Sequence, residues 1–581
     1  MRFEAKIRDG NTRLGELEIK GKTIIIIPAI LWYSSPRIPA PAFAEVKLGE
    51  NIGGGGTFFY PEECEVCIPP ALIYPHSFPE EIHERSFALS KGFFTNISIV
   101  SARWQVKKAD MYVMAQAREV FSNPRIFVDS VVNIRNNIGY APLYAPGIAT
   151  PLNMAILSYA GIDIFDSIAV VQKTRKNRYL TPEGEYDAST MEEYPCRCPY
   201  CREGIHDYHD LLMHNYEVMR SELVAIRQAI RKRMLREYAE AKAHFNPHFA
   251  SIFRIFDREY HSFQEKRYPV TGNTVRVSCW SLERPDIRRF RERVISRYRK
   301  PACAKVLLLL PCSARKPYSR SKSHQRFKRI IASCPQRNII HEVIVTSPLG
   351  LVPRELENIY PAAHYDISVT GEWSKEEVEM IDHLLHDYLA VNHYEMIINH
   401  LPSALPLSLE GEVIHTCREH PTSDASLEML EKAVKRAEDI EAVRHTQRRR
   451  DNVRAMLQYQ FGEAAELLLD GCAVKGKFPD YKLYQQGRQL ACFSQKRGMF
   501  SLTLPGGEKL GRYYWVEIDD FIPKGSIFAV GVKDADEKIR SGDEVVVFHQ
   551  GEVRGVGVAR MNAEEMRESK TGEAVKIRHH L

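Results

Sequence analysis

The sequence predicts an α/β protein that is built from several domains. Apolar runs of strand length alternate with helical patterns over much of the chain, and Val306 to Leu310 is the clearest strand. From about residue 510 onward the pattern changes to short strands and turns. A chain of 581 residues is also too long for a single core, so three or four domains are expected.

The composition is that of an ordinary globular protein. Hydrophobic residues make up 44% of the chain, charged residues make up 27%, and the net charge is only +6. Any binding of nucleic acid must therefore rely on a local basic surface rather than on the charge of the whole chain. The longest apolar run, Ile24 to Tyr33, is too short to span a membrane, and the N-terminus has no secretory pattern. We therefore expect a cytoplasmic protein with no membrane partner.

The individual elements follow from the spacing of apolar residues. Tyr216 to Ala241 has an apolar stripe at helical spacing and is expected to form one long amphipathic helix. A second α/β unit is expected between about residues 300 and 420, and a highly charged helical segment follows from Ser426 to Leu469. The expected strands and helix of this second unit are Lys305–Leu310, Glu342–Val345, Tyr365–Val369 and Lys375–Ala390.

Two segments are rich in arginine. One runs from Arg284 to Lys300 with arginines at 288, 289, 291, 293, 297 and 299, and the other runs from Arg444 to Arg450. The first segment is either a solvated helix or a surface that faces phosphates, and the residue pattern does not decide between them. Both segments are candidate contacts for an RNA backbone, and such contacts would weaken steeply with salt.

Five of the twelve cysteines fall in two clusters. Cys196, Cys198 and Cys201 supply three thiolates within six residues, and one imidazole would complete a closed tetrahedral zinc shell. The spacing therefore predicts a structural zinc site, with His206, His209 and His214 as candidates for the fourth ligand. Cys64 and Cys67 form the second cluster, and a pair of buried thiols is favoured there over a metal half-site because no second cysteine pair stands nearby.

Residues 311–324 concentrate reactive side chains directly after the apolar strand that ends at Leu310. The segment reads Pro-Cys-Ser-Ala-Arg-Lys-Pro-Tyr-Ser-Arg-Ser-Lys-Ser-His and contains one potential nucleophile, Cys312. Ligands of open α/β sheets bind beyond the carboxyl ends of central strands, which is where this segment is expected to lie. The nearby cations Arg315 and Lys316 would lower the pKa of a thiol at this position. The segment is therefore the best candidate for the chemistry.

Three separated stretches resemble the tRNA-guanine transglycosylases. In the first, which leads from Leu143 to Ser167, the residue matching Asp166 is the family's nucleophile at the mouth of a (β/α)8 barrel. The cysteine cluster with His214-Asn215 resembles the family's zinc subdomain, and this resemblance implies His214 as the fourth ligand. The third stretch resembles a PUA domain, a small RNA-binding barrel, in its segments 524–532, 540–545 and 555–561.

The sequence departs from the transglycosylases at one functional position. Their early Asp-Ser-Gly-Gly/Ser-Phe-Gln signature is absent from residues 1–150, where Asp129-Ser130 is the nearest echo. This departure argues against base exchange by Asp166, which would then bind substrate or fill an N-cap or salt-bridge role. A transglycosylase and a non-catalytic tRNA-binding subunit stay as alternatives to the function below.

The segment 311–324 resembles the signature of the archaeosine synthase family, an archaeal paralogue of the transglycosylases. The matching residues are Pro311-Cys312, Lys316-Pro317-Tyr318, Ser321 and His324. The resemblance implies four domains: a transglycosylase-like (β/α)8 barrel with a zinc subdomain over 1–280, a second α/β domain with the motif over 281–425, a small α+β domain over 426–505 and a PUA β-barrel over 506–581. It also implies an enzyme that adds an amine to the nitrile of 7-cyano-7-deazaguanine in the D arm of tRNA.

The chemistry of the side chains suggests roles for the residues of this motif, given that substrate. Cys312 would add to the nitrile carbon to give a thioimidate that an amine then displaces, and His324 or Lys316 would move protons. The side chains of Arg315, Tyr318, Ser319 and Ser321 are predicted to bind substrate. Asp366 or Glu355 would hold the cationic amine of the donor.

The implied partners follow from the same resemblance. They are tRNA that carries the nitrile base, lysine or glutamine as the amine donor, and a radical-SAM lyase that cleaves the lysine adduct. A homodimer is left open by the sequence.

Overall fold

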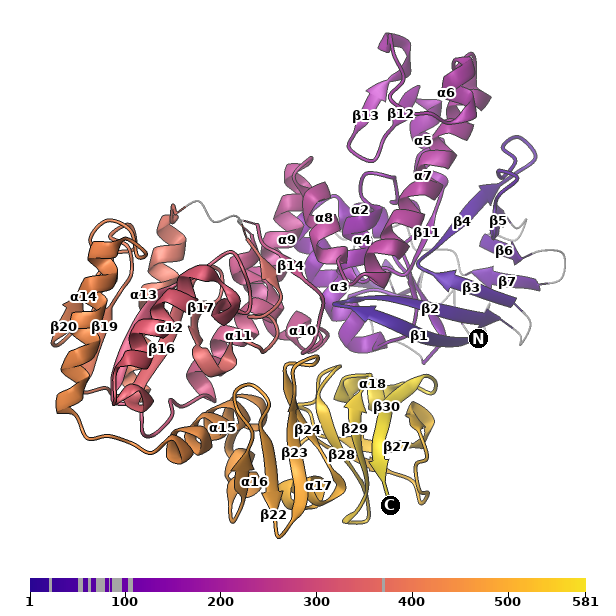
Figure 1. Cartoon of the computed structure of the whole chain (residues 1–581). Coiled ribbons are helices and arrows are strands. Elements are labelled where there is room, and N and C mark those ends of the chain that lie inside the picture. Colours follow the sequence, from indigo (N-terminus) through magenta and orange to yellow (C-terminus); the bar gives the residue numbers. More distant parts are fainter. Residues whose placement is uncertain are drawn as a thin grey trace. The chain divides into compact units, whose positions relative to one another are not determined.

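A computed structural model describes the chain at residues 1–19, 23–50, 56–60, 64–68, 79–82, 84–85, 97–102, 108–278, 280–367 and 371–581 (Figure 1). Side chains are described for all of these except 23, 49–50, 56–60 and 64–68. The chain forms two compact units, residues 1–268 with 568–572 and residues 269–567 with 573–581, and each is treated by itself. No described helix is long and apolar enough to cross a membrane.

The first unit is built on two sheets that share one core. β1 (Arg2–Asp9), β2 (Thr12–Ile19) and β3 (Thr23–Ile27) form an antiparallel sheet. Leu17 and Ile25 of this sheet pack in one cluster with Leu31, Val113 and Ile164 of the second sheet. The second sheet has the order β7-β6-β5-β4-β11-β10-β9-β8, with β4 (Ala29–Ser34), β5 (Lys47–Glu50), β6 (Gly56–Tyr60), β7 (Cys64–Ile68), β8 (Ile97–Val100), β9 (Met111–Met114), β10 (Leu143–Tyr144) and β11 (Ile164–Asp166).

The neighbouring strands from β5 to β8 in this order are parallel. β4, the first of these strands in the chain, pairs with β11, the last of them. Ala29 of β4 pairs with Ile164 of β11, and Leu31 pairs with Asp166. A (β/α) barrel closes by a pairing of this kind between its first and last strands. No pairing between β7 and β8 occurs among the described residues, so the closed eight-stranded barrel stays a prediction.

Helices connect and cover the strands of this unit. The longest connection, α3 (Pro124–Ile138), begins with Pro124 behind an Asn123 cap that accepts from two backbone N–H groups, and it ends at Gly139 with a φ of 56°. The other helices and the β-hairpin are α2 (Ala117–Phe121), α4 (Met154–Ala160), α5 (Ile168–Arg175), β12 (Arg178–Leu180), β13 (Glu185–Asp187), α6 (Pro199–Glu203), α7 (Tyr208–Arg231), α8 (Leu235–Ala243), α9 (Pro247–Glu259) and α10 (His261–Glu265).

The prediction of one helix from Tyr216 to Ala241 is wrong. Two helices, α7 and α8, cover this segment, and Arg233 between them has a left-handed φ of 53° that breaks the helical hydrogen-bond ladder. The apolar stripe continued across the break, so its spacing did not reveal the change of direction. Two other expectations fall outside the described residues. They concern the side chains of Cys64 and Cys67 and the end of the predicted strand at Val369.

The centre of the second unit is a five-stranded sheet in the order β17-β16-β15-β19-β20. β15 is the central strand and pairs in parallel with β16 and with β19, while β17 is antiparallel to β16. The bounds are β15 (Val306–Pro311), β16 (Ile340–Thr346), β17 (Gly350–Pro353), β19 (Met396–Asn399) and β20 (Val413–His415). The predicted strand at Tyr365 forms β18 (Tyr365–Asp366), which pairs with β14 (Val275–Arg276) rather than with this sheet.

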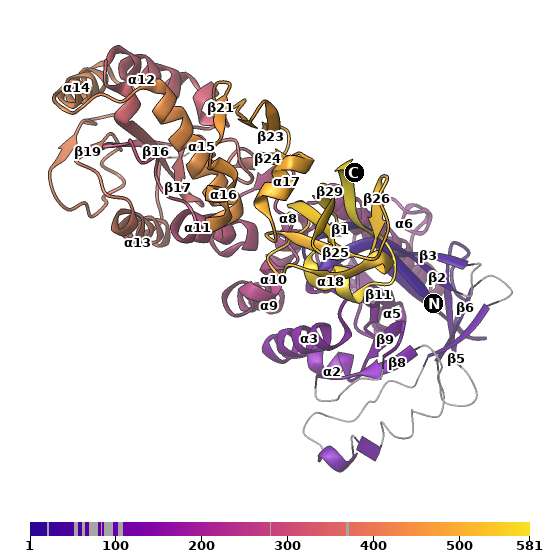
Figure 2. The same ribbon diagram turned by 90° about the horizontal axis from the view of Figure 1, so that it is seen from below.

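Helices cover both faces of this sheet. Successive residues of β15 point to opposite sides, so the strand contacts both layers of helices. Leu307 and Leu309 pack in the cluster of α11 (Pro285–Ser296) and α13 (Lys375–Val391). Leu308 and Leu310 pack in the cluster of α12 (Lys322–Ser333) and α14 (Asp424–Lys435). The two pairs of helices lie on opposite sides of the strands (Figure 2). The predicted helix from Lys375 is confirmed and begins with a capping box between Ser374 and Glu377.

Two further sheets follow in the second unit. α15 (His445–Phe461) and α16 (Ala465–Leu469) precede an antiparallel sheet, and α17 (Leu504–Leu510) follows it; the strands are β21 (Ala473–Lys475), β22 (Lys482–Gln485), β23 (Arg488–Ser494) and β24 (Met499–Leu502). The last sheet has the order β26-β30-β29-β28-β25-β27 and curls around its own core, with β25 (Trp515–Ile518), β26 (Ser526–Phe528), β27 (Val532–Ala535), β28 (Glu544–His549), β29 (Glu552–Ala559), α18 (Ala563–Glu568) and β30 (Glu573–His580). The mixed α/β architecture with several domains is as predicted.

Candidate functional site

The segment 311–324 leaves the carboxyl end of the central strand β15, as the sequence predicts. Val306 to Leu310 are fully buried, Pro311 pairs with Val345 of β16, and Cys312 follows at once. β16 ends at Thr346, so the two strands place Cys312 and Thr346 at the same edge of the sheet. This edge is where open α/β sheets bind ligands.

A chain of hydroxyl groups leads to the thiol of Cys312. The hydroxyls of Tyr318 and Tyr365 hydrogen-bond each other, and the Tyr365 hydroxyl lies 2.6 Å from Thr346 Oγ1. The Thr346 hydroxyl donates to the Ser347 carbonyl at 3.2 Å and lies close enough to the thiol to act on its pKa. Burial raises the pKa of Cys312, while the Thr346 hydrogen bond and the charge of Lys316 act in the opposite direction. Thr346 and Tyr365 were not among the predicted site residues, because they come from β16 and β18.

Lys316 is the other reactive group beside Cys312. Its Nζ is buried, has no hydrogen-bond partner among the described residues, and lies 4.0 Å from the centroid of the Tyr365 ring. Burial lowers the pKa of Lys316, and the charges of Cys312 and Asp366 partly oppose this shift. A lowered pKa favours the neutral form of a buried amine, which can accept a proton.

Other predicted residues of the motif have structural contacts. Ser321 is buried and caps α12 by accepting a hydrogen bond from the backbone N–H of His324 at 3.2 Å. His324 is buried as well, with Nε2 3.0 Å from the Pro311 carbonyl and Nδ1 2.8 Å from Arg354 Nη2. Burial, together with the charge of Arg354, lowers the pKa of His324 to about 3. Both ring nitrogens are therefore engaged, and these contacts favour a positioning role over the predicted proton transfer.

The remaining predicted residues differ in exposure. Arg315 and Asp366 are exposed, and Asp366 is within electrostatic range of Lys316. Ser319 is half-buried, and its backbone N–H donates to the Glu357 carboxylate at 3.0 Å. Tyr318 is fully buried, so its hydroxyl acts inside the hydroxyl chain rather than on the surface.

Glu355 has contacts that do not suit the predicted binding of a donor amine. Its carboxylate is buried and accepts hydrogen bonds from the Tyr298 hydroxyl and from His341, whose Nε2 lies 3.3 Å away. Burial alone would raise the pKa of Glu355, but the charge and hydrogen bond of His341 lower it to about 2. Glu355 therefore belongs to a packed ionic cluster.

Asp166 also lies at the carboxyl end of a parallel strand, β11, and its carboxylate accepts three hydrogen bonds. One carboxylate oxygen accepts from the Tyr144 hydroxyl at 2.6 Å and from the Gly147 N–H at 2.7 Å, and the other accepts from the Ile168 N–H at 2.9 Å. The side chain is fully buried, and burial raises its pKa. These contacts hold the Gly147 turn and the start of α5. They favour the capping role of Asp166 over the role of a nucleophile.

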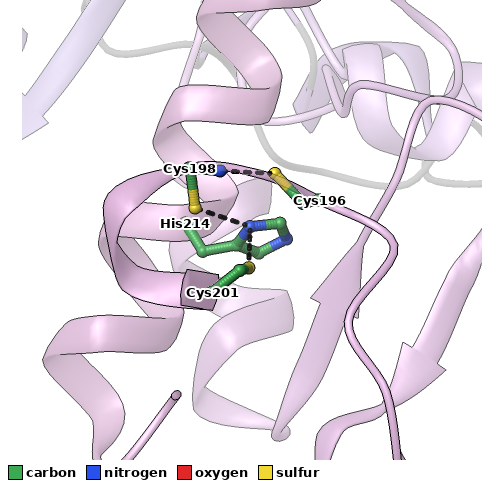
Figure 3. Close-up of side chains that lie close together, drawn as sticks. All are labelled: Cys196, Cys198, Cys201 and His214. Atoms are coloured by element: carbon green, nitrogen blue, oxygen red, sulfur yellow. Dashed lines mark hydrogen bonds between the residues drawn. The ribbon is translucent and has the colours of Figure 1, made fainter. Parts of the chain in front are cut away.

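The cysteine cluster forms a compact set of possible metal ligands. One ligand atom from each of Cys196, Cys198, Cys201 and His214 lies within 4.8 Å of the others (Figure 3). His214 Nδ1 lies 3.5 Å from the Cys198 sulfur and 3.2 Å from the Cys201 sulfur, and Nε2 lies 3.1 Å from the Leu180 carbonyl. That second contact fixes the ring so that Nδ1 faces the sulfurs. The other two candidates, His206 and His209, are exposed.

Many arginine side chains of the two arginine-rich segments are buried or bind backbone carbonyls within the second unit. Arg289, Arg291 and Arg293 are buried, and Arg291 Nη1 donates to the Pro348 carbonyl at 3.1 Å. In the other segment, Arg448 Nη1 donates to the carbonyls of Asn338 and Ile340, and Arg450 donates to Leu469. These contacts favour packing over the phosphate-facing interpretation.

Comparison with known proteins adds to this geometry. Residues 107–248 match the family described as queuine tRNA-ribosyltransferase, residues 287–434 match a domain of unknown function, and residues 515–581 match the PUA domain. The archaeosine synthase subunit alpha of Methanosarcina acetivorans is 34% identical, with 99% of both chains covered. The archaeosine synthase of Haloferax volcanii is also 34% identical, again with 99% of both chains covered.

The chain belongs to the archaeosine synthase family. A tRNA-guanine(15) transglycosylase of Methanothermobacter thermautotrophicus is 27% identical, with 78% of this chain and 68% of that protein covered. In this member of the archaeosine synthase family, Asp166 lies in the region that matches the ribosyltransferase model. Cys312 lies instead in the region that matches the domain of unknown function.

Proposed function

We propose that this protein modifies tRNA in archaeosine biosynthesis by adding an amine to the nitrile of 7-cyano-7-deazaguanine in the D arm. The observation that supports this most is the strand-end site, where the half-buried thiol of Cys312 lies within electrostatic range of the Lys316 amine. This amine has no hydrogen-bond partner among the described residues. Full-length similarity to two archaeosine synthases supports the same reaction class, a transferase acting on tRNA.

The first step is the attack of the Cys312 thiolate on the nitrile carbon. A C–S bond forms, one π bond of the nitrile breaks, and its electron pair moves to nitrogen, which takes a proton to give a thioimidate. Lys316 is proposed to take the thiol proton and to pass it to this nitrogen, because burial lowers its pKa and so favours the neutral amine that can accept a proton. The Thr346 hydroxyl, which ends the hydroxyl chain and donates to the Ser347 carbonyl, is proposed to turn its proton to the thiolate and stabilise it.

The second step is the displacement of Cys312 by the amine. The amine nitrogen attacks the thioimidate carbon, the C–S bond breaks, and the thiolate leaves while the amine loses a proton to Lys316. The product is an amidine on the base, and Cys312 is regenerated. The donor is L-lysine, or nitrogen from glutamine in the alternative assignment, and exposed Asp366 is proposed to hold the ammonium group of the donor.

Other residues of the motif hold the site in place. His324 ties the Pro311 carbonyl to Arg354, and Ser321 caps the helix that follows the loop. Arg315 and Ser319, which are exposed and half-buried, are proposed to contact the substrate. Asp166 is proposed to be structural, because its buried carboxylate accepts three hydrogen bonds that hold the surrounding backbone and Tyr144.

We also propose that Cys196, Cys198, Cys201 and His214 hold one structural Zn²⁺. Three thiolates and one imidazole fill a tetrahedral shell and leave no open position for catalysis. The ion would stabilise the thiolates of Cys198 and Cys201, because burial otherwise raises the pKa of both thiols, to about 12 for Cys201. The first unit would then serve as a scaffold that binds tRNA together with the PUA domain, in the cytoplasm where tRNA is modified. A radical-SAM lyase as the next enzyme and a homodimer stay proposals of the same kind.

The test is to incubate tRNA that carries the nitrile base with labelled lysine or glutamine and to follow the mass of the modified nucleoside. Wild type is expected to incorporate the donor, and Cys312→Ala is expected to lose at least about a thousandfold of the rate. Cys417→Ala is the matched control, because Cys417 is also partly exposed but lies away from residues 311–324 in sequence.

Each outcome has a distinct meaning. Incorporation that survives Cys312→Ala would contradict the thioimidate. Exchange of guanine without a gain in mass would favour the transglycosylase alternative, and tRNA binding without either reaction would favour a non-catalytic subunit.

A further inference from the structure

The loop and helix that follow Cys312 carry a surface of exposed cations. From Arg293 to His341 the sequence contains no Asp or Glu. Within this stretch the side chains of five cations are exposed on the loop and on α12, and we call these residues the α12 basic surface: Arg315, Arg320, Lys322, Lys328 and Arg329. Phe327 and Ile331, which face the sheet, are the buried side of the same helix.

No carboxylate of the described chain neutralises this surface. None of its five side chains forms an ion pair or a hydrogen bond with another described residue, whereas the neighbouring Arg326 pairs with Asp424 at 3.1 Å. The arginines of α11 and α15 behave differently, since Arg291 and Arg448 donate to backbone carbonyls. In a chain with a net charge of only +6, a free cluster of this size is a local positive field directed at solvent.

The α12 basic surface begins at the candidate site. Arg315 follows Cys312 in the same loop, Arg320 and Lys322 flank the Ser321 cap, and the other two cations lie two turns further along α12. Two turns of helix correspond to about 10 Å, so the five cations extend over several phosphates of an RNA strand.

The kind of partner follows from the residues around these cations. No large apolar side chain between residues 280 and 367 of the described chain is exposed, while the core of a protein–protein interface is usually apolar and aromatic. Free arginine and lysine side chains without apolar neighbours are typical of contacts to sugar and phosphate. These observations favour RNA over an acidic protein.

We propose that the α12 basic surface binds the backbone of the tRNA arm that carries the nitrile base, on either side of the nucleotide that enters the site. The proposal deepens the function given above and rests on it. Because Cys312 is only partly exposed, the target nucleotide must leave its stack to reach the thiol, and backbone contacts beside the opening would hold the flanking phosphates while it does so. The surface supplies affinity and position but does not read the sequence.

The test uses the full chain and unmodified tRNA, and it measures dissociation constants over a series of KCl concentrations. The variant Lys322→Gln/Lys328→Gln/Arg329→Gln removes three cations on exposed helix positions where Gln is well tolerated. The slope of log Kd against log salt is expected to fall by about one for each cation lost, with binding weakened at least about tenfold near physiological salt.

The matched control removes three exposed cations that are paired with carboxylates in the same sheet domain. Lys375, Lys432 and Lys435 pair with Glu379, Glu428 and Glu431, and the corresponding triple Gln variant is expected to bind tRNA as wild type does. Thermal unfolding of both variants checks that each is folded.

A triple variant of α12 with the affinity and salt slope of wild type would overturn the proposal, and binding of an acidic protein partner would then be the remaining explanation. Steady-state kinetics give a second readout: KM for tRNA rises while kcat at saturating tRNA is retained, because uniform binding was removed. These outcomes are separate from the chemistry. The slope measured on a Cys312→Ala background stays informative even if the thioimidate mechanism fails.

Discussion

The carboxyl ends of β11 and β15 place Asp166 and Cys312 in equivalent positions, but they surround them differently. Asp166 is fully buried and accepts three hydrogen bonds, so its carboxylate is committed to the fold. Cys312 is half-buried beside an amine that lacks any described hydrogen-bond partner. A strand end is thus only a location. Whether it supports chemistry depends on how many of its polar groups have been left without partners.

The largest effect is expected from Lys316→Met, which keeps the length of the side chain but removes the amine. The rate of amine addition should fall by about a hundredfold to ten-thousandfold, while tRNA affinity stays the same. Single-turnover rates and dissociation constants measure the two quantities, and Lys375→Met at an exposed helix position is the control. A change in affinity alone would mean that Lys316 binds substrate and that the contrast between the strand ends is not catalytic.

Loss of the proposed zinc site should lower the stability of the first unit only. His214→Ala is expected to remove one zinc per chain and to lower the free energy of unfolding by several kcal/mol, because structural zinc sites contribute to folding. His209→Ala, in an exposed position, should change neither quantity. Metal content and chemical denaturation measure the effect. Retention of a full equivalent of zinc in the His214 variant would contradict the assigned ligand set.

Asp166→Asn separates structure from catalysis at β11. The amide turns an NH₂ group toward N–H donors, so we expect a loss of about 1–3 kcal/mol in unfolding free energy. Amine addition by the folded fraction should stay within about threefold of wild type, since no proposed step uses Asp166. A hundredfold loss of turnover in a stable variant would restore a functional role to this strand end.

The free energy of unfolding should depend on pH through His324 in the site loop. Its pKa in the folded protein is lowered to about 3, below the ordinary value of 6.5, so the stability from the neutral ring is present above pH 6.5 and is lost as the pH falls. By this linkage wild type should lose about 2 kcal/mol more than His324→Gln between pH 7 and pH 5. Denaturant unfolding of both proteins at the two pH values measures the difference. Parallel losses would mean that the ring is not held neutral.

The smallest effect is expected from the hydroxyl chain. Thr346→Val keeps the shape of the side chain but removes the hydroxyl beside Cys312, and loss of its proposed hydrogen bond to the thiolate should lower the rate about tenfold and raise the apparent pKa of the thiol. The pH dependence of thiol alkylation measures that pKa, with Thr422→Val as a half-buried control on another loop. An unchanged alkylation profile would exclude Thr346 from thiolate stabilisation.

Sequence reasoning located the site but not its full membership. The apolar strand before Cys312 and the position of the loop beyond it followed from a local pattern, and the buried core of β15 agrees with it. Thr346 and Tyr365 reach the thiol from β16 and β18, and that proximity depends on the order of strands, which no local pattern contains.

Composition was least informative for the cations. Arginine density pointed to 284–299 and 444–450, yet many of these side chains bind carbonyls inside the unit. A more informative signal was the absence of acidic residues from Arg293 to His341, because exposed cations in such a stretch have no carboxylate close in sequence to pair with. Membership of the motif was also a poor guide to the role of Ser321 and His324. Ser321 caps α12, and His324 contacts the Pro311 carbonyl.

The pairing of β4 with β11 has a consequence for synthesis of the chain. Ala29 cannot find its partner until Ile164 has left the ribosome, so the apolar edge of β4 stays open while the intervening residues are made. Contacts this distant in sequence fold slowly and expose strand edges in the meantime. Nascent chains that stop short of β11 should therefore aggregate or recruit chaperones, whereas chains extended past it should resist proteolysis.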